Sequence, residues 1–297
     1  MLFPPPLKRG DTIAVIAPSS PFEHVLGWRG LGFLAERYRL RFDRGALFAR
    51  RGYLAGEDGA RRDALARALE EPDVAAILAA RGGYGANRFV HSVDFAGLRE
   101  RPRWIIGFSD ITALHVEASR VGVASLHACH LTAVGRSDRR ARAGLLQALE
   151  DPLGTRVFDG LRTIVAGRAE GPLFGGNLTM LHACAAAGRL VVPEGAIVFL
   201  EDVTERPYRI DRMLTTLAVG GHFERARGFV LGDFTQCDPG GDGVTVADVV
   251  RDRLAGLGVP VVAGAPIGHG LVNEPVVVGA PTVVDASQHA ASVVLFP

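Results

Sequence analysis

The sequence predicts an α/β protein whose N-terminal half contains a parallel sheet and whose C-terminal half forms a second domain. In the first 120 residues, short apolar runs typical of buried strands alternate with segments that have helical spacing. The chain of 297 residues is 48% hydrophobic, which is enough for two cores. A charged stretch at 136–160, rich in turn residues towards its end, predicts a boundary between the two halves.

The N-terminal half contains repeated units of strand, loop and helix. The predicted strands are 12–17, 74–80 and 104–106, and the predicted helices are 28–38, 61–70, 111–118 and a helix from Arg88 onward. Parallel strands place their carboxyl ends at one edge of a sheet, so the loops 18–20, 81–85 and 107–110 should meet there. The sequence therefore predicts a functional edge formed by three polar loops.

The C-terminal half is expected to follow a linker. We assign residues 1–150 to the N-terminal domain, 151–170 to the linker and 171–297 to the C-terminal domain. GPLFGGN at 171–177 predicts a loop. The later predicted strands are 196–200, 228–231 and 259–263, and the later predicted helices are 178–187, 210–218 and 246–257. A valine-rich segment ends the chain.

Composition excludes several classes of protein. The 33 basic and 32 acidic residues give a net charge of +1, so no overall field favours nucleic acid or an anionic membrane surface. Apolar runs are too short or too interrupted to span a bilayer, and MLFPPPLKRG has prolines where a signal peptide needs an apolar core. Cys129, Cys184 and Cys237 are well separated and fit a reducing compartment. We therefore expect a cytoplasmic protein without a membrane segment.

Three residues at strand exits form a candidate catalytic set. Ser109 lies in the strand-to-helix turn of IIGFSDITALH, although an isolated serine there can also be an N-cap. Glu201 follows the strand 197–200, where an acid can also be a cap, and His269 stands between two glycines in PIGHG. The chain order serine, acid, histidine supplies the groups for acyl transfer. The turn lacks the second glycine of G-x-S-x-G, which disfavours an α/β-hydrolase.

Cofactor motifs are weak in this sequence. RGGYGANR at 81–88 does not have the flanks of a dinucleotide fingerprint, and GGN at 175–177 is not followed by the lysine of a P-loop. His127 and His130 could suggest a metal pair, but no carboxylate or thiolate lies nearby at a matching spacing. We expect no nucleotide, no metal ion and no organic cofactor.

Motifs along nearly the whole chain resemble the LD-carboxypeptidase family of serine peptidases, which includes muropeptide carboxypeptidases and microcin C self-immunity peptidases. In order, these motifs are GDTIAVIAPSSP, ARGGYGANR, IIGFSDITALH, GPLFGGNLTMLHA, FLEDVTERPYRIDRMLTTL, GFVLGDFTQC and PIGHG. The resemblance implies a Rossmann-like, class I amidotransferase-like N-terminal domain and a smaller, β-rich α/β C-terminal domain. It also implies a homodimer and an active site to which both domains contribute.

The resemblance also implies roles for individual residues. Ser109 corresponds to the nucleophile of a G-[YF]-S-D motif, Glu201 to the acid of L-E-D and His269 to the base of G-H-G. The backbone amides of Asp110 and Gly83 are expected to bind the oxyanion. The implied reaction releases the terminal D-alanine from cytoplasmic murein tetrapeptides during cell-wall recycling, with a small peptide as substrate.

Two departures from the family pattern bear on the substrate. The family often has His-Gly-Pro after the serine helix, whereas residues 125–130 read SLHACH and retain only His127. Residues 158–171 are short and contain no tryptophan, unlike the longer loop of the self-immunity peptidases, which favours the muropeptide branch. Arg81 and Arg206 are candidate ligands of the substrate carboxylate. The alternatives are a peptidase acting on an aminoacyl-nucleotide or related amide conjugate, and a catalytically silent ligand-binding homologue.

Overall fold

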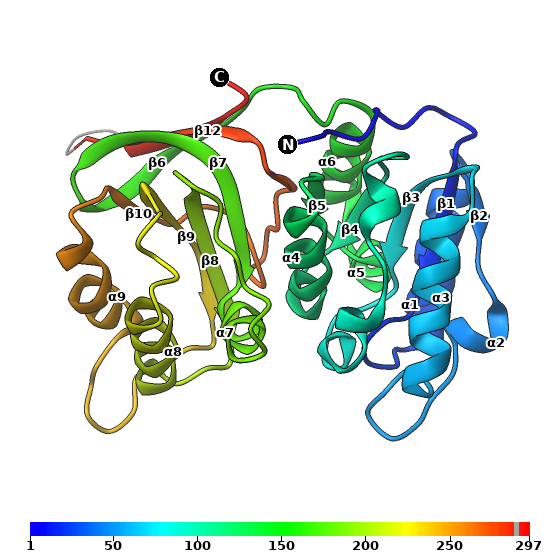
Figure 1. Ribbon diagram of the computed structural model, residues 1–297, viewed down its shortest axis with the longest axis horizontal. Coiled ribbons are helices and arrows are strands. Elements are labelled where there is room, and N and C mark those ends of the chain that lie inside the picture. The colour runs from blue at the N-terminus through cyan, green and yellow to red at the C-terminus, as the bar shows by residue number, and fades with distance from the viewer. Residues whose placement is uncertain (288–290) are drawn as a thin grey trace. The chain divides into compact units, whose positions relative to one another are not determined.

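The computed structural model describes residues 1–287 and 291–297, and the chain divides into two compact units (Figure 1). Unit 1 comprises Met1–Pro152 and Glu274–Val277, and unit 2 comprises Leu153–Asn273 and Val278–Pro297. The chain therefore passes from unit 1 into unit 2, returns to unit 1 for a short segment and ends in unit 2.

Unit 1 is built on a six-stranded sheet in the order β11-β5-β4-β3-β1-β2. Its strands are β1 (Thr12–Ile16), β2 (Arg39–Arg41), β3 (Val74–Ala79), β4 (Trp104–Gly107), β5 (Ser125–His127) and β11 (Val276–Val278). The pairs β1–β2, β1–β3, β3–β4 and β4–β5 are parallel. Every residue of β1 and β4 is buried, as expected for parallel strands that are covered on both faces.

The helices of unit 1 follow the predicted alternation with one exception. They are α1 (His24–Ala35), α2 (Arg44–Leu47), α3 (Asp58–Glu70), α4 (Thr112–Arg120), α5 (Leu131–Arg136) and α6 (Arg139–Glu150). The prediction of a helix from Arg88 onward is wrong, because the chain there forms the 3₁₀ turns η1 (Ala86–Arg88), η2 (Val90–Ser92) and η3 (Ala96–Leu98). The Ser92 hydroxyl donates to the Phe89 carbonyl and the Asp94 carboxylate accepts from the Ala96 amide. Such local bonds compete with a continuous helix.

Helices α1 and α5 approach so closely that glycine is required on both. A Cβ atom at Gly30 of α1 would lie 2.4 Å from the Leu131 carbonyl oxygen, and one at Gly135 of α5 would lie 2.0 Å from the Leu26 carbonyl oxygen. Real Cβ atoms do not approach a carbonyl so closely, so either side chain would push the two backbones apart. Packing of the two helices therefore explains why glycine occupies both positions.

We expect Gly30→Ala to lower the free energy of unfolding by about 1–3 kcal/mol, because the added methyl group overpacks the crossing of α1 and α5. Gly32→Ala is the matched control in the same helix, since a Cβ at Gly32 meets no atom within 4 Å. This control should raise the free energy of unfolding by up to about 1 kcal/mol through helix propensity. Urea unfolding of both variants checks the pair. Equal changes would show that the helices separate without strain.

Unit 2 contains a closed seven-stranded barrel in the order β10-β6-β13-β12-β7-β8-β9. The strands are β6 (Arg156–Val165), β7 (Gly167–Asn177), β8 (Ile197–Val203), β9 (Gly228–Thr235), β10 (Val261–Ala263), β12 (Pro281–Ala286) and β13 (Ala291–Leu295). The pairs β7–β8, β8–β9 and β9–β10 are parallel, whereas β6–β10, β6–β13, β12–β13 and β7–β12 are antiparallel. The predicted fold class, an N-terminal parallel sheet followed by a β-rich α/β unit, is confirmed.

The helical segments of unit 2 are α7 (Leu178–Ala186), α8 (Pro207–Val219), α9 (Val246–Leu254) and the 3₁₀ turn η5 (Ala255–Leu257). Figure 1 shows α7, α8 and α9 beside the yellow-green strands β8 and β9. In the part of the chain that the structure describes, no helix has both the length and the apolar character needed to cross a bilayer.

The start of unit 2 differs from the sequence prediction. Residues 151–170, assigned to a linker, contain β6 and the first part of β7, and the predicted loop GPLFGGN is the end of β7. A Cβ at Gly171 would lie 1.9 Å from the Gly195 carbonyl oxygen, and one at Gly175 would lie 1.9 Å from the Phe199 carbonyl oxygen. These glycines permit close backbone approach within the barrel and do not form a turn.

Candidate active site

Ser109 lies at the end of β4, in a backbone conformation that serine rarely adopts. Its φ angle is +65°, in the left-handed region, and it begins the 3₁₀ turn η4 (Ser109–Ile111) that leads into α4. Gly107 precedes it with a φ of +156°, and a Cβ at Gly107 would lie 2.8 Å from Cγ1 of Ile111. The chain therefore folds tightly back at this corner. Strain of this kind is common where a side chain must be presented for function.

The side chain of Asp110 joins the three loops expected at the carboxyl edge of the sheet. Its Oδ2 atom accepts a hydrogen bond from the Ser19 hydroxyl at 2.5 Å and one from the Ala86 amide at 2.8 Å. Burial raises the pKa of Asp110 to about 6, although the bonds from Ser19 and Ala86 and the charge of Arg61 oppose this shift. The loop 81–85 joins the same edge through the bond from the Ser20 amide to the Gly82 carbonyl oxygen at 3.2 Å, so the three loops meet as predicted.

The loop after β3 lies directly against Ser109. A Cβ at Gly82 would lie 3.1 Å from the Ser109 hydroxyl oxygen. Gly83 has a φ of +100°, and a Cβ there would lie 2.5 Å from the Ser20 hydroxyl oxygen. The same hydroxyl oxygen accepts a hydrogen bond from the Tyr84 amide at 3.1 Å. Because neither glycine carries a side chain, the backbone of this loop can come close to the serine.

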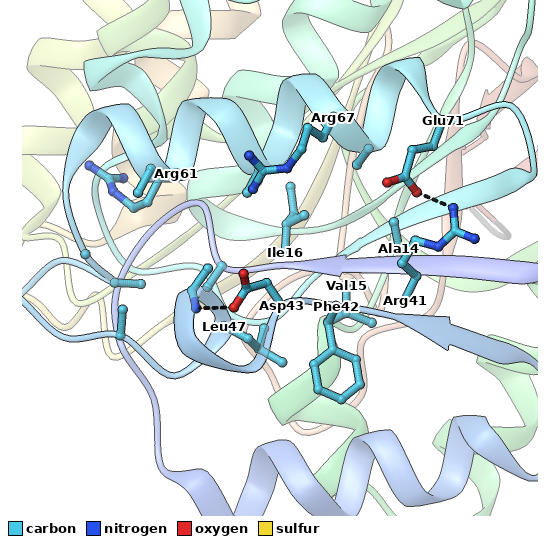
Figure 2. Close-up of a pocket in the computed structure, with 18 residues that line it drawn as sticks. Ala14, Val15, Ile16, Arg41, Phe42, Asp43, Leu47, Arg61, Arg67 and Glu71 are labelled. Atoms are coloured by element: carbon cyan, nitrogen blue, oxygen red, sulfur yellow. Dashed lines mark hydrogen bonds and ion pairs between the residues drawn. The ribbon is translucent and has the colours of Figure 1, made fainter.

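The buried guanidinium of Arg61 holds the loops after β1 and β3 through their carbonyl oxygens. It donates to the carbonyl oxygens of Pro18 and Gly85 and forms an ion pair with Asp58. Arg61 also lines one end of a cavity of about 380 Å³, bounded by α3, β1 and the segment after β2 (Figure 2). Alanine predominates in the lining, and none of the predicted catalytic residues contributes to it. Arg61 therefore acts here as structural support for two loops at the candidate site.

The histidines near Ser109 have structural partners. His115 is fully buried, and its ring nitrogens contact the Gly107 carbonyl and the Ser125 hydroxyl, both at 2.9 Å. Burial lowers the pKa of His115 to about 4, so it is neutral near pH 7. His130 caps α5 by accepting the Ala133 amide. Across the residues that the structure describes, no group of three potential ligands could hold a metal ion, and so the metal pair His127 and His130 gains no support.

In unit 2, Glu201 and His269 form a hydrogen-bonded pair. Nδ1 of His269 lies 2.6 Å from Oε2 of Glu201. Glu201 is the fifth residue of β8 and is fully buried. Burial lowers the pKa of His269, but the hydrogen bond and the charge of Glu201 outweigh burial, so its pKa is raised overall. Burial raises the pKa of Glu201, and the contact with His269 opposes that shift. The bond to Glu201 fixes the orientation of the imidazole ring at Nδ1.

The acid next to Glu201 has a different role. The Asp202 carboxylate accepts hydrogen bonds from the Asn177 amide group, the Thr179 amide, the Thr179 hydroxyl and the Val203 amide, at 2.8 to 3.1 Å. These donors lie at the start of α7 and at the end of β8. Asp202 therefore joins a helix N-terminus to a strand, which is the capping role that an acid at a strand exit can have.

The two arginines proposed as carboxylate ligands are exposed. Arg81 donates to the Pro21 carbonyl oxygen at 2.5 Å, and Arg206 donates to the carbonyl oxygens of Asp238 and Pro239 at 3.3 and 3.2 Å. Each guanidinium has five N–H donors, so these contacts leave donors for a ligand.

The predicted site residues are divided between the two units. The structure places Ser109, Asp110, Gly83 and Arg81 in unit 1. It places Glu201, His269 and Arg206 in unit 2.

The arrangement in unit 2 can act as a base. An imidazole that donates Nδ1–H to a buried carboxylate presents the lone pair of Nε2, and the carboxylate stabilises the imidazolium that forms on protonation. Sequence reasoning placed the loop 18–20 at this edge but gave no role to Ser19, and it did not identify Arg61 as a residue of the site. Only the folded chain shows what these two side chains contact.

Known proteins share both the sequence and the fold of this chain. Residues 13–128 match the model of the LD-carboxypeptidase N-terminal domain, and residues 170–284 match that of the LD-carboxypeptidase C-terminal domain. A probable murein peptide carboxypeptidase of Bacillus subtilis is 34% identical, with 97% of this chain and 93% of that protein covered. A murein tetrapeptide carboxypeptidase of Pseudomonas aeruginosa is 33% identical, with 76% of this chain and 77% of that protein covered.

A solved structure extends the likeness to three dimensions. The crystal structure of muramoyltetrapeptide carboxypeptidase from Oxalobacter formigenes superposes with a TM-score of 0.85 at 26% identity, covering 96% of this chain and 99% of that chain. Both domain models match in order, and the Bacillus subtilis relative covers nearly the full length of this chain. The chain therefore belongs to the LD-carboxypeptidase family.

Proposed function

We propose that this protein is a serine LD-carboxypeptidase that releases the terminal D-alanine of murein tetrapeptides, with Ser109 as nucleophile, His269 as base and Glu201 as the acid that orients it. The observation that carries the proposal is the 2.6 Å contact between His269 Nδ1 and the buried Glu201 Oε2. It is supported by the strained presentation of Ser109 at a strand end and by membership of the family. The names of the relatives from Bacillus subtilis and Pseudomonas aeruginosa give murein peptides as their substrates.

The proposed reaction has two covalent steps. His269 Nε2 takes the Ser109 proton as Oγ attacks the scissile carbonyl, and the amides of Gly83 and Asp110 stabilise the oxyanion. The C–N bond then breaks, and His269 returns its proton to the departing amine of D-alanine. A water molecule, deprotonated by His269, attacks the acyl-enzyme. The shortened peptide leaves with a new carboxylate, and the proton from His269 restores the Ser109 hydroxyl.

Substrate specificity should depend on the free terminal carboxylate. Arg81 and Arg206 are the proposed cationic partners for this group. Replacing the carboxylate with an amide removes the charge that pairs with these arginines and leaves their N–H donors unpaired where the bound peptide excludes water. A penalty of a few kcal/mol follows, on the order of a hundredfold in kcat/KM. An L-alanine terminus should also be poor, because its carbonyl cannot meet both Ser109 and the oxyanion donors.

The test compares tetrapeptides that end in D-alanine, L-alanine and D-alaninamide. Mass spectrometry should show loss of one alanine from the first, with kcat/KM about a hundredfold above the other two. Similar values for all three peptides would reject the LD-carboxypeptidase assignment. An aminoacyl-nucleotide conjugate is included as a fourth substrate. Cleavage of that conjugate with no peptide cut would select the self-immunity type of activity instead.

A further inference from the structure

The two glycines that flank His269 each lie against a carboxylate. A Cβ at Gly268, whose φ is +117°, would lie 2.6 Å from Oε2 of Glu201. A Cβ at Gly270 would lie 2.1 Å from Oδ2 of Asp233, on the neighbouring strand β9. The two glycines of the G-H-G motif therefore allow the backbone to hold the histidine between two acids. Glu201 is one of them, and Asp233 is the second.

Asp233 holds the turn that carries His269 at two points. Its backbone amide donates to the Ile267 carbonyl oxygen at 2.9 Å, and its carboxylate accepts the Gly270 amide. Gly232 permits this approach, since a Cβ there would lie 2.3 Å from the Ile267 carbonyl oxygen. Asp233 thus binds the chain on both sides of His269.

We propose that Asp233 is a positioning residue for His269, which fixes the 266–270 turn through Gly270 and Ile267 and adds a negative charge beside the imidazole. This inference rests on the proposed function, in which His269 is the catalytic base. A base must keep Nε2 on the line between the nucleophile and the leaving group, and a displaced turn would move that atom. Glu201 fixes Nδ1 of the ring, and Oδ1 of Asn273 accepts the Gly268 amide at 3.0 Å. Asp233 adds contacts to the turn on both sides of the histidine.

The charge of Asp233 acts together with those of its neighbours. In unit 2, the titratable groups that act on His269 are Glu201 and Asp202 on β8 and Asp233 on β9, and all three raise its pKa. The pKa of Asp233 is itself raised by burial, while the Gly270 amide and the charge of His269 oppose the shift. Removing the charge of Asp233 should therefore lower the pKa of His269.

Two variants separate the hydrogen bond from the charge. Asp233→Asn keeps an oxygen acceptor for the Gly270 amide but removes the charge. We expect kcat at pH 8 within about threefold of wild type, and an acid limb of kcat/KM shifted about one pH unit lower. Asp233→Ala removes both, so kcat should fall about tenfold or more with little change in KM. Rescue of kcat by asparagine is the signature of positioning.

Asp238→Asn is the matched control, because it removes one exposed carboxylate shortly after the end of β9. It should leave kcat and the pH profile unchanged. NMR titration of His269 in wild type, Asp233→Asn and Asp238→Asn gives the pKa without any substrate. This measurement decides the inference even if Asp233→Ala does not fold.

Three results would overturn the inference: an unchanged kcat in Asp233→Ala, an effect confined to KM, or the same His269 pKa in Asp233→Asn as in Asp238→Asn. Failure of the proposed function has a different signature. It would appear as full activity of a Ser109 variant, whatever the titration of His269 shows.

Discussion

Ser109→Ala is expected to reduce kcat/KM on murein tetrapeptides by about 10⁵-fold while the protein remains folded. The hydroxyl supplies the covalent step, and its removal leaves only binding and oxyanion stabilisation. Alanine has the same Cβ as serine, so the strain at a φ of +65° is unchanged by this substitution. Steady-state kinetics measures the loss of kcat/KM, and urea unfolding checks that the variant remains folded. Activity above a few per cent of wild type would remove Ser109 from the proposed triad.

Ser109→Gly provides the control that links strain to function. Glycine adopts positive φ without penalty, so this variant should be as inactive as Ser109→Ala but more stable by about 1 kcal/mol. A gain in stability with loss of activity would show that the native serine is kept in an unfavourable conformation for chemistry. No gain would show that the surrounding loops, and not the residue at position 109, determine the backbone there.

The parallel sheet of unit 1 was predictable because its strands are buried on both faces and carry continuous apolar runs. Residues 12–17 and 104–106 show this pattern clearly. The barrel strands β6 and β7 were missed for the opposite reason. They are half exposed and rich in glycine and charge, so their pattern resembles that of a linker. Glycine in a strand and glycine in a turn look alike until the neighbouring backbone is known.

The proposed triad was accessible to sequence reasoning because each member follows a predicted strand and lies in a recognisable motif. Supporting residues were not, since their partners lie far away in the chain. Arg61 binds the carbonyl oxygens of Pro18 and Gly85, 43 and 24 residues away. Asp233 follows a predicted strand too, but its role depends on a turn that begins at Pro266. Contacts of this kind leave no local spacing to detect.

Glu201→Gln should lower kcat/KM by about 10³-fold to 10⁴-fold, which is less than the loss in Ser109→Ala. The glutamine amide can still contact Nδ1 of His269, but it allows the wrong tautomer and does not stabilise the imidazolium. The nucleophile and the oxyanion donors remain, so some turnover should persist. Measurement of kcat/KM on the alkaline plateau of the wild-type pH profile tests this order of effects, because the base is then in its active, neutral form.

Asp202→Asn should have the opposite effect to Glu201→Gln, with a loss of stability and little loss of activity. Asp202 accepts from four donors at the junction of β8 and α7, and an asparagine NH₂ group cannot accept from any of them. At least one buried donor then loses its partner, which should lower the free energy of unfolding by about 1–3 kcal/mol. Activity at pH 8 should remain within about threefold, since His269 keeps its bond to Glu201. If instead Asp202→Asn loses activity a thousandfold and Glu201→Gln does not, Asp202 is the acid of the triad.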